Sequence, residues 1–260
     1  MGAVPENVVL LHGFGGTHRA WDSVVAHLDP ARYLPLALDL PGHGQQAAHE
    51  PADSVSFESC LESVLARSPE HFQLCGYSLG ARIALHVALA APERVGRLFL
   101  IGATPGIEDE GERERRREAD HRLADALEGE DFEEWIERWR AQPLFAQEPR
   151  DVGELARADH RRNDPRALAA VLRGVGTGEM TPLWHRLAAL SMPVCLLAGS
   201  RDQKFSDIAR RMALLIGRVE LAQLEGGHSL ALERPAEVAA VLQGFRPQRA
   251  HPAGASAPAR

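Results

Sequence analysis

Lysine is almost absent from this chain, because 28 of its 29 basic residues are arginines and only Lys204 is a lysine. The formal net charge is −7, which argues against a nucleic-acid-binding surface as the main function. No stretch approaches the roughly 18 apolar residues that a membrane span requires. An apolar strand is expected already at Val8, which leaves no room for a signal peptide. We therefore expect a cytoplasmic protein without a membrane span or a nucleic-acid partner; the oligomeric state is left open.

Cysteine is also scarce. The three cysteines Cys60, Cys75 and Cys195 are odd in number and lack the C-x-x-C spacing of metal or redox sites. Cys75 and Cys195 lie in apolar runs and are expected to be core thiols. We predict a reducing compartment and no metal site. The 260 residues, 45% of them hydrophobic, are enough for one large domain or for a domain with an insertion.

Short apolar runs alternate with helix-forming stretches along most of the chain. Strands are predicted over 7–11, 34–40, 71–75, 95–102, 192–199 and 219–224, and helices over 57–66, 81–90, 207–215 and 235–242. This alternation is typical of a mostly parallel sheet with helices on both faces, an α/β fold.

The pattern breaks between residues 105 and 182, where the chain is charged and helix-prone and has no apolar strand. We predict a core formed by residues 1–104 and 183–245 and a helical lid formed by residues 105–182. Residues 246–260 are rich in Pro, Ala, Arg and Gly without periodicity, so they are predicted to be disordered.

The run Gly76-Tyr77-Ser78-Leu79-Gly80 joins a predicted strand to a predicted helix. A turn this tight strains the backbone of the serine, and glycine two residues on either side lets strand and helix approach. A chance G-x-S-x-G in a turn of small residues is the simpler interpretation. With the strand and helix in place, the run resembles the nucleophile elbow of the α/β-hydrolase fold. In that fold the lid would lie between the sixth and seventh strands of the standard sheet.

A nucleophilic serine needs a base, and the base needs an orienting acid. Asp202 and His228 each follow a predicted strand, and they come after Ser78 in the order typical of this fold. We therefore predict a triad of Ser78, Asp202 and His228. Asp202 could instead cap the next helix, and Asp207 is the second candidate for the acid, although it lies far into that helix.

The run His12-Gly13-Phe14-Gly15-Gly16 follows the first predicted strand. In α/β-hydrolases a His-Gly loop at this place supplies one donor of the oxyanion hole, and the residue after the nucleophile supplies the other. Here these donors would be the backbone N–H groups of Phe14 and Leu79. An ordinary glycine-rich turn is the alternative.

Six stretches carry a resemblance that goes beyond the fold. They are Leu11-His12-Gly13-Phe14, Asp39-Leu40-Pro41-Gly42-His43-Gly44, Gly76-Tyr77-Ser78-Leu79-Gly80-Ala81-Arg82, Trp139-Arg140-Ala141-Gln142-Pro143-Leu144-Phe145, Leu172-Arg173-Gly174-Val175-Gly176-Thr177-Gly178 and Gly199-Ser200-Arg201-Asp202-Gln203-Lys204-Phe205. Together they resemble the family of 2-succinyl-6-hydroxy-2,4-cyclohexadiene-1-carboxylate synthase, a lyase of menaquinone biosynthesis. The resemblance covers the chain up to its tail and is most particular in Arg82, the Trp-x-x-Gln-Pro-x-Phe motif, the Leu-Arg-Gly-x-Gly-Thr-Gly run and Asp-x-Lys-Phe.

The resemblance implies elimination of pyruvate from 2-succinyl-5-enolpyruvyl-6-hydroxy-3-cyclohexene-1-carboxylate, a small tricarboxylate, by proton abstraction at Ser78. It implies no metal and no organic cofactor. The same triad would also suit a serine hydrolase of a small carboxylated ester or C–C bond substrate, marked by an acyl-enzyme. A non-catalytic ligand receptor on the same fold is a further alternative.

The resemblance also implies that arginines bind the substrate carboxylates, which suits their planar, permanently charged head groups. Arg82 matches one of them, although it could be a surface helix residue in an ion pair. Arg116 matches a second, within a charge run that is otherwise typical of a solvated helix face.

At the position of a third arginine the chain has His160, followed by Arg161 and Arg162. Either His160 binds weakly and in a pH-dependent manner, or a neighbouring arginine replaces it. Tyr77 and Trp139 are expected to line the pocket; Trp139 could instead belong to the lid core.

Overall fold

The computed structural model describes residues 4–48 and 55–245 of the chain. Six strands form one sheet in the order β2-β1-β3-β4-β5-β6, with every neighbouring pair parallel. The predicted parallel sheet is confirmed. The strands are β1 (Glu6–Leu11), β2 (Tyr33–Leu38), β3 (Phe72–Tyr77), β4 (Val95–Ile101), β5 (Val194–Gly199) and β6 (Val219–Leu224).

The strand order reverses between β1 and β3, because the chain first moves outward to β2 and then crosses to the other side of β1. At such a switch point the loops after the two strands diverge and leave a crevice at their carboxyl ends. The His12-Gly13 loop follows β1 and Ser78 follows β3, so both lie at this crevice.

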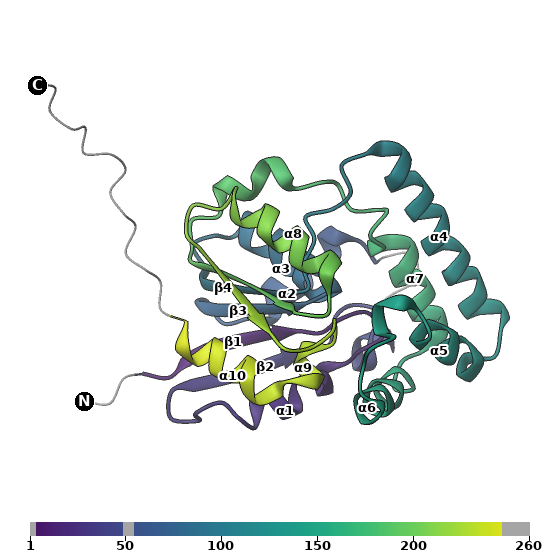
Figure 1. Ribbon diagram of the computed structural model, residues 1–260, viewed down its shortest axis with the longest axis horizontal. Helices are drawn as coiled ribbons and strands as arrows, with labels where there is room; N and C mark the ends of the chain where they lie inside the picture. The colour runs from purple at the N-terminus through teal and green to yellow at the C-terminus, as the bar shows by residue number, and fades with distance from the viewer. Residues whose placement is uncertain (1–3, 49–54, 246–260) are drawn as a thin grey trace, which may run out of the picture.

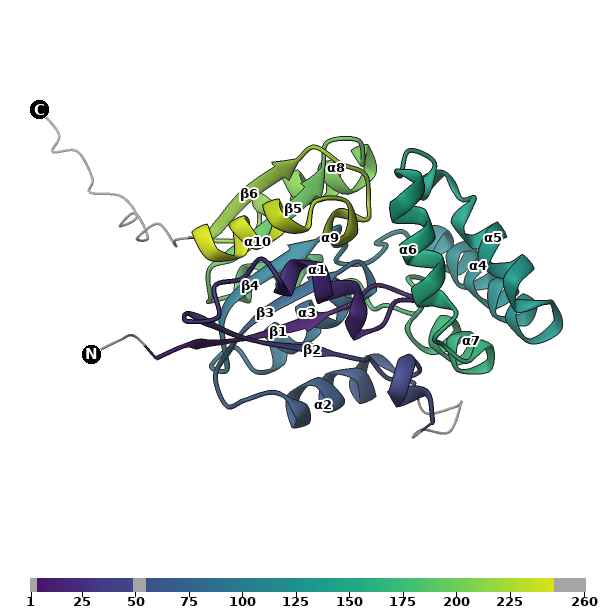
Figure 2. The same cartoon turned by 90° about the horizontal axis from the view of Figure 1, so that it is seen from below.

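Helices cover both faces of the sheet, since side chains alternate in direction along each strand (Figures 1 and 2). The helices α2 (Phe57–Arg67), α3 (Leu79–Ala90) and α8 (Gln203–Ala213) pack on one face. The other face is covered by α1 (Asp22–Val25), α9 (Leu230–Glu233) and α10 (Pro235–Gly244).

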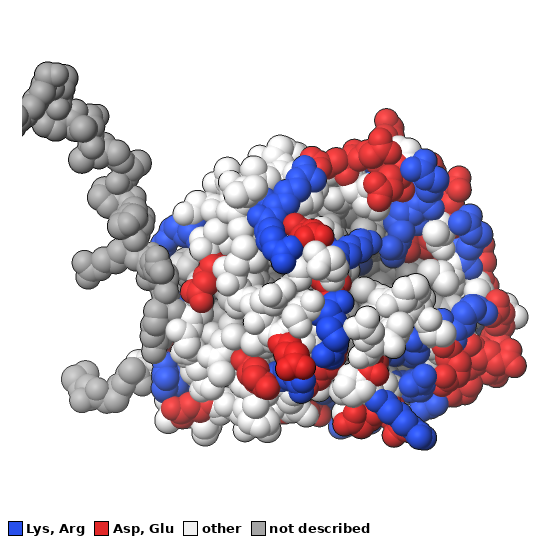
Figure 3. Space-filling view, in the orientation of Figure 1, with Lys and Arg blue, Asp and Glu red and all other residues white. Residues whose placement is uncertain are grey.

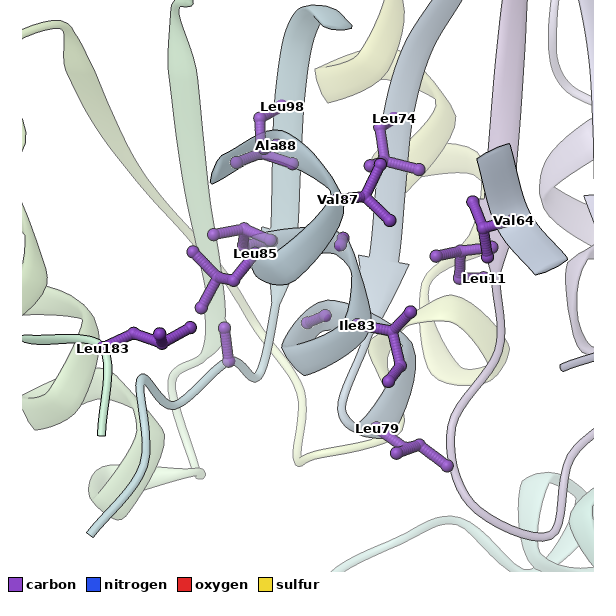
Figure 4. Packing of buried hydrophobic residues seen from close by; sticks show 14 of the residues in the cluster. Leu11, Val64, Leu74, Leu79, Ile83, Leu85, Val87, Ala88, Leu98 and Leu183 are labelled. Atoms are coloured by element: carbon purple, nitrogen blue, oxygen red, sulfur yellow. The ribbon is translucent and has the colours of Figure 1, made fainter. Parts of the chain in front are cut away.

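Helix α3 is apolar on almost all sides and lies in the centre of the first layer. Figure 4 shows Val87 of this helix beside Leu74 of β3, and Ala88 beside Leu98 of β4. This packing fixes the helix that begins directly after Ser78.

Four helices between β4 and β5 form an insertion beyond the carboxyl ends of the strands (Figure 2). They are α4 (Glu110–Gly129), α5 (Phe132–Arg140), α6 (Arg150–His160) and α7 (Pro165–Val175). A separate apolar cluster, which includes Trp135 and Leu168, holds them together. Short 3-10 turns complete the fold at His18–Trp21, Gly44–Ala48, Pro143–Phe145 and Trp184–Ala189.

One predicted boundary was wrong. Helix α8 begins at Gln203, not near Asp207, because the Asp202 carboxylate accepts a hydrogen bond from Phe205 N and caps the helix. The predicted disordered tail, residues 246–260, lies outside the described residues. Over the described ranges, no helix combines the length and apolar character needed to cross a membrane.

Candidate active site

Ser78 lies in a strained turn between β3 and α3. Its φ of 53° is the only positive value of a non-glycine residue in the described part of the chain, a conformation that L side chains adopt at a cost. A Cβ on Gly76 would meet Gly80 O at 2.3 Å, and one on Gly80 would meet Leu11 O at 2.2 Å. The two glycines therefore allow the close approach that holds the serine at the start of α3.

A hydrogen-bonded chain connects Ser78 to two later loops. Ser78 Oγ lies 3.0 Å from His228 Nε2, and His228 Nδ1 lies 2.6 Å from Asp202 Oδ2. Asp202 and His228 are 8% and 3% exposed, so this chain is shielded from bulk water. Asp202 uses one oxygen to cap α8 and the other to contact His228, so the two interpretations do not exclude each other. Asp207 is exposed and pairs with Gln203 and Arg210 instead.

The loop after β1 faces Ser78. A Cβ on Gly13 would lie 3.5 Å from Ser78 Cβ, and Gly80 N donates to His12 O at 3.0 Å. The N–H groups of Phe14 and Leu79 have no acceptor among residues 4–48 and 55–245. Leu79 N–H is free because it is in the first turn of α3. Both donors are thus available to a bound anion.

Above this chain of three residues is a cavity of about 520 Å³, enclosed by the strand ends and the insertion. Figure 3 shows basic side chains bordering a recess on this face. The cavity is lined by all of the predicted substrate-binding residues, namely Tyr77, Arg82, Arg116, Trp139 and His160, as well as by Phe14.

Arg82 is buried on α3, and its Nη1 donates to Val175 O at 2.6 Å. It forms no ion pair within the described residues, so the alternative of a surface ion pair is wrong. Burial, and next the charge of Arg116, lower the pKa of Arg82 to about 10. The guanidinium remains charged at neutral pH and faces the cavity without an acidic partner.

Arg116 is the arginine of its charge run that lines the cavity. Its Nε donates to Asp120 Oδ1 at 2.9 Å, and Asp120 is fully buried. Gly178 N also approaches the Asp120 carboxylate, at 3.3 Å. Arg117 instead pairs with Glu114 and Glu179 away from the cavity.

Tyr77 and Trp139 form aromatic walls. The Tyr77 ring lies 5.4 Å from the His228 ring, and its hydroxyl lies 3.3 Å from Ser229 Oγ. Burial raises the pKa of Tyr77 to about 12, so the hydroxyl is neutral. Trp139 stacks on Trp135 and contacts Phe14 with ring centroids 4.8 Å apart. Trp139 therefore belongs to both the packing of the insertion and the cavity wall.

The pKa of His160 does not lie near the usual value of a histidine. Burial, assisted by the charges of Arg140 and Arg157, lowers the pKa of His160 to about 4, so it is neutral at physiological pH. Its Nδ1 donates to Ala156 O at 2.8 Å, which leaves Nε2 as an acceptor. A Cβ on Gly15 would lie 2.4 Å from that atom. His160 thus packs against the loop after β1 and offers no donor to a carboxylate.

Arg161 and Arg162 do not replace it. Arg161 pairs with Glu133 on the surface, Arg162 lies 3.6 Å from Asp159, and neither lines the cavity.

Sequence reasoning missed a set of contacts, here called the latch, between the end of α6 and the loop after β1. Asp159 accepts hydrogen bonds from Thr17 N at 2.8 Å and Thr17 Oγ1 at 2.6 Å. Asn163 Nδ2 donates to Gly15 O at 2.8 Å, and its Oδ1 accepts from Gly44 N at 2.9 Å. The insertion thus holds the loop that carries the Phe14 N–H.

Sequence reasoning also missed two ion pairs in the cavity wall, one of them buried and the other partly exposed. Arg140, the last residue of α5, pairs with Glu148, and Arg201 pairs with Glu233 at 2.8 Å. Both oxygens of Glu233 accept from Gly227 N, next to His228. The only signal for Arg140 was its place beside Trp139 in the lid motif.

Comparison with known proteins agrees with this geometry. Residues 8–241 match a family model described as "Alpha/beta hydrolase family", the class that the parallel sheet and strained serine define. Proteins named 2-succinyl-6-hydroxy-2,4-cyclohexadiene-1-carboxylate synthase are similar in sequence. The one from Enterobacter sp. is 34% identical over 90% of this chain and 89% of its own. The one from Klebsiella pneumoniae is 34% identical over 90% and 91%.

A solved structure described as MenH from S. aureus has a TM-score of 0.86 and 28% identity, over 93% of this chain and 94% of its own. The chain belongs to the α/β-hydrolase family and, within it, to the 2-succinyl-6-hydroxy-2,4-cyclohexadiene-1-carboxylate synthase family.

Proposed function

We propose that this protein is a carbon–oxygen lyase that eliminates pyruvate from 2-succinyl-5-enolpyruvyl-6-hydroxy-3-cyclohexene-1-carboxylate. The observation that carries the proposal is the chain of hydrogen bonds from Ser78 through His228 to Asp202, below a cavity walled by Arg82 and Arg116. The substrate is a small tricarboxylate, so its charge suits these arginines. A small charged metabolite of this kind is water-soluble, and we place the reaction in the cytoplasm.

The reaction begins with removal of the ring proton next to the succinyl ketone. His228 Nε2 accepts the proton of Ser78 Oγ, and Asp202 orients the imidazole and stabilises its positive charge. Ser78 Oγ then takes the C2 proton of the substrate. The negative charge that develops on the ketone oxygen is stabilised by the N–H groups of Phe14 and Leu79.

Elimination follows through the ring. The electrons of the C2–H bond form a C2–C3 double bond, the C3–C4 double bond moves to C4–C5, and the C5–O bond breaks. The leaving enolpyruvate takes up the proton that His228 received from Ser78 and becomes pyruvate, which returns His228 to its neutral form. The cyclohexadiene product keeps the succinyl group, the hydroxyl and the ring carboxylate. Ser78 ends the cycle as a hydroxyl, without an acyl-enzyme.

The experiment is a coupled assay in which lactate dehydrogenase reports pyruvate released from the enolpyruvyl substrate. We expect turnover by the unmodified protein and loss of turnover in Ser78→Ala. The serine-hydrolase alternative predicts a burst of nitrophenol from a nitrophenyl ester and a covalent adduct on Ser78 by mass spectrometry. Tight binding of the enolpyruvyl substrate without turnover would indicate the alternative of a non-catalytic ligand receptor. Either of the last two results, with no pyruvate released, contradicts the proposal.

A further inference from the structure

The cavity wall carries fewer free cations than the proposed substrate has carboxylates. Arginine and lysine contribute five side chains to the wall. Three of them are paired with an acid of the same wall, as Arg116–Asp120, Arg140–Glu148 and Arg201–Glu233. Within the described ranges, only Arg82 and Lys204 among the five lack such an acid. If each of the three carboxylates binds one cation of this wall, at least one of them binds an arginine that already has a partner.

Two of the three acids are anchored by the backbone. Asp120 accepts from Gly178 N, and Glu233 accepts from Gly227 N with both of its oxygens. Displacing either acid would leave a backbone N–H group without this acceptor, which is costly where the group is shielded from water.

Glu148 differs from them. Its Oε2 bonds Arg140, but its Oε1 is buried and has no hydrogen-bond partner among the described residues. Arg140 Nε is likewise buried and unpartnered. The side chains of Arg140 and Glu148 are only 4% and 6% exposed, so water does not readily satisfy these atoms. Each residue of the pair therefore has one buried polar atom without a hydrogen bond, and both residues line the cavity.

The position of Arg140 suits contact with a ligand near Ser78. Its guanidinium carbon lies 3.9 Å from the centre of the Phe145 ring, which fixes the plane of the head group. Phe145 in turn lies 6.4 Å from the His228 ring, measured between ring centroids. Burial lowers the pKa of Arg140 to about 10, so it stays charged at neutral pH.

We propose that Arg140 binds a carboxylate of the substrate, and that Glu148 occupies this arginine in the empty cavity and is displaced when the substrate binds. The planar guanidinium offers Nε and the terminal amines as a fork that matches a carboxylate. This inference rests on the proposed function for the identity of the tricarboxylate. It assigns to Arg140 the contact that the neutral His160 does not make.

The test compares Arg140→Gln, Glu148→Gln and a control, Arg138→Gln, whose exposed side chain pairs with Glu130 on the outer side of the same helix. With the enolpyruvyl substrate, Arg140→Gln should raise KM about 10-fold or more and change kcat less than threefold. Glu148→Gln should lower KM about threefold, because the competing carboxylate is gone. Arg138→Gln should match the unmodified protein.

Opposite changes in KM for Arg140→Gln and Glu148→Gln indicate that Glu148 and the substrate compete for Arg140. If both substitutions raise KM, or neither changes it, the pair only holds the insertion together and the proposal is wrong. If Arg140→Gln does not fold, Glu148→Gln decides alone, since tighter binding supports the proposal and unchanged or weaker binding contradicts it.

A second measurement does not depend on turnover. Propane-1,2,3-tricarboxylate should raise the melting temperature of the unmodified protein, more so that of Glu148→Gln, and least that of Arg140→Gln. If the unmodified protein releases no pyruvate, the proposed function fails, whereas this order of melting temperatures still decides whether Arg140 binds carboxylates. An equal shift in all three proteins would contradict the assignment.

Discussion

Replacing Asn163 with alanine should lower kcat without a matching change in KM. Asn163 is 7% exposed and belongs to the latch. Its side chain donates to Gly15 O and accepts from Gly44 N, at 2.8 and 2.9 Å. Gly15 N also donates to His43 Nε2, at 3.2 Å. The substitution therefore frees one side of the loop that carries the Phe14 N–H and leaves the other side held.

The magnitude follows from the two groups that lose their partner. Each buried polar group left unsatisfied costs about 1–3 kcal/mol, so the substitution costs about 2–6 kcal/mol if the loop stays in place. A shift of the loop relieves part of this cost but moves the Phe14 donor away from the developing negative charge. Loss of a complete oxyanion donor costs about 10²–10³-fold in kcat. For a displaced donor we expect a decrease of about 10- to 100-fold.

The assay is steady-state pyruvate release together with thermal unfolding, with Arg161→Ala as the matched control. Arg161 is two residues away, exposed and paired with Glu133, outside the latch. Asn163→Asp keeps an acceptor for Gly44 N but places a carboxylate against Gly15 O, so it should lower kcat as strongly as alanine does. If Asn163→Ala melts earlier but keeps kcat within twofold, the latch only stabilises the insertion and the reasoning fails.

Three further outcomes are expected. Ser78→Ala and His228→Ala should each lower kcat about 10³-fold or more, and the double variant should be little worse than either, because the triad acts as a unit. Arg116→Ala should cost about 2–4 kcal/mol in kcat/KM through a lost charge-assisted contact, and Arg117→Ala should cost much less. Equal small effects of the two substitutions would indicate that the charge run around Arg116 is a solvated helix face. The pKa of His160, about 4, is below the unfolded value of about 6.5, so the unfolded chain binds more protons between these pH values and stability falls as pH decreases through this window. His160→Gln should remove up to about 3 kcal/mol of this acid sensitivity in pH-dependent unfolding; an unchanged pH slope would show that His160 is not buried as a neutral side chain.

The elbow was predictable because its constraint is local. Only glycine fits at Gly76 and Gly80, where a Cβ would clash with the backbone of the facing segment. Asp202 and His228 could be found because parallel strands place their following loops at one edge of the sheet. The start of α8 could not be placed correctly, because Asp202 serves as cap and as partner of His228 at once.

The latch and the Arg140–Glu148 pair could not be predicted, since they depend on contacts that no spacing encodes. Asn163 and Gly15 are separated by 148 residues in the chain. The acceptor state of His160 depends on its Nδ1 bond to Ala156 O and on burial under the loop after β1. In the sequence alone, a histidine beside two arginines indicates a titrating anion contact. Only the packed structure shows that the arginines point outward and the histidine is neutral.

The insertion has two separate roles in this scheme, and a double variant tests whether they are separate. Arg140 at the end of α5 is proposed to bind substrate, whereas Asn163 after α6 holds the loop that stabilises the transition state. Independent roles predict that the effects of Arg140→Gln and Asn163→Ala on kcat/KM add to within about 0.5 kcal/mol. The charge of Arg140 contributes to the lowered pKa of His160, and His160 is three residues from Asn163. The two sites are therefore close enough to interact. A coupling above about 1 kcal/mol would show that Arg140 acts through the latch and not by direct contact with a carboxylate.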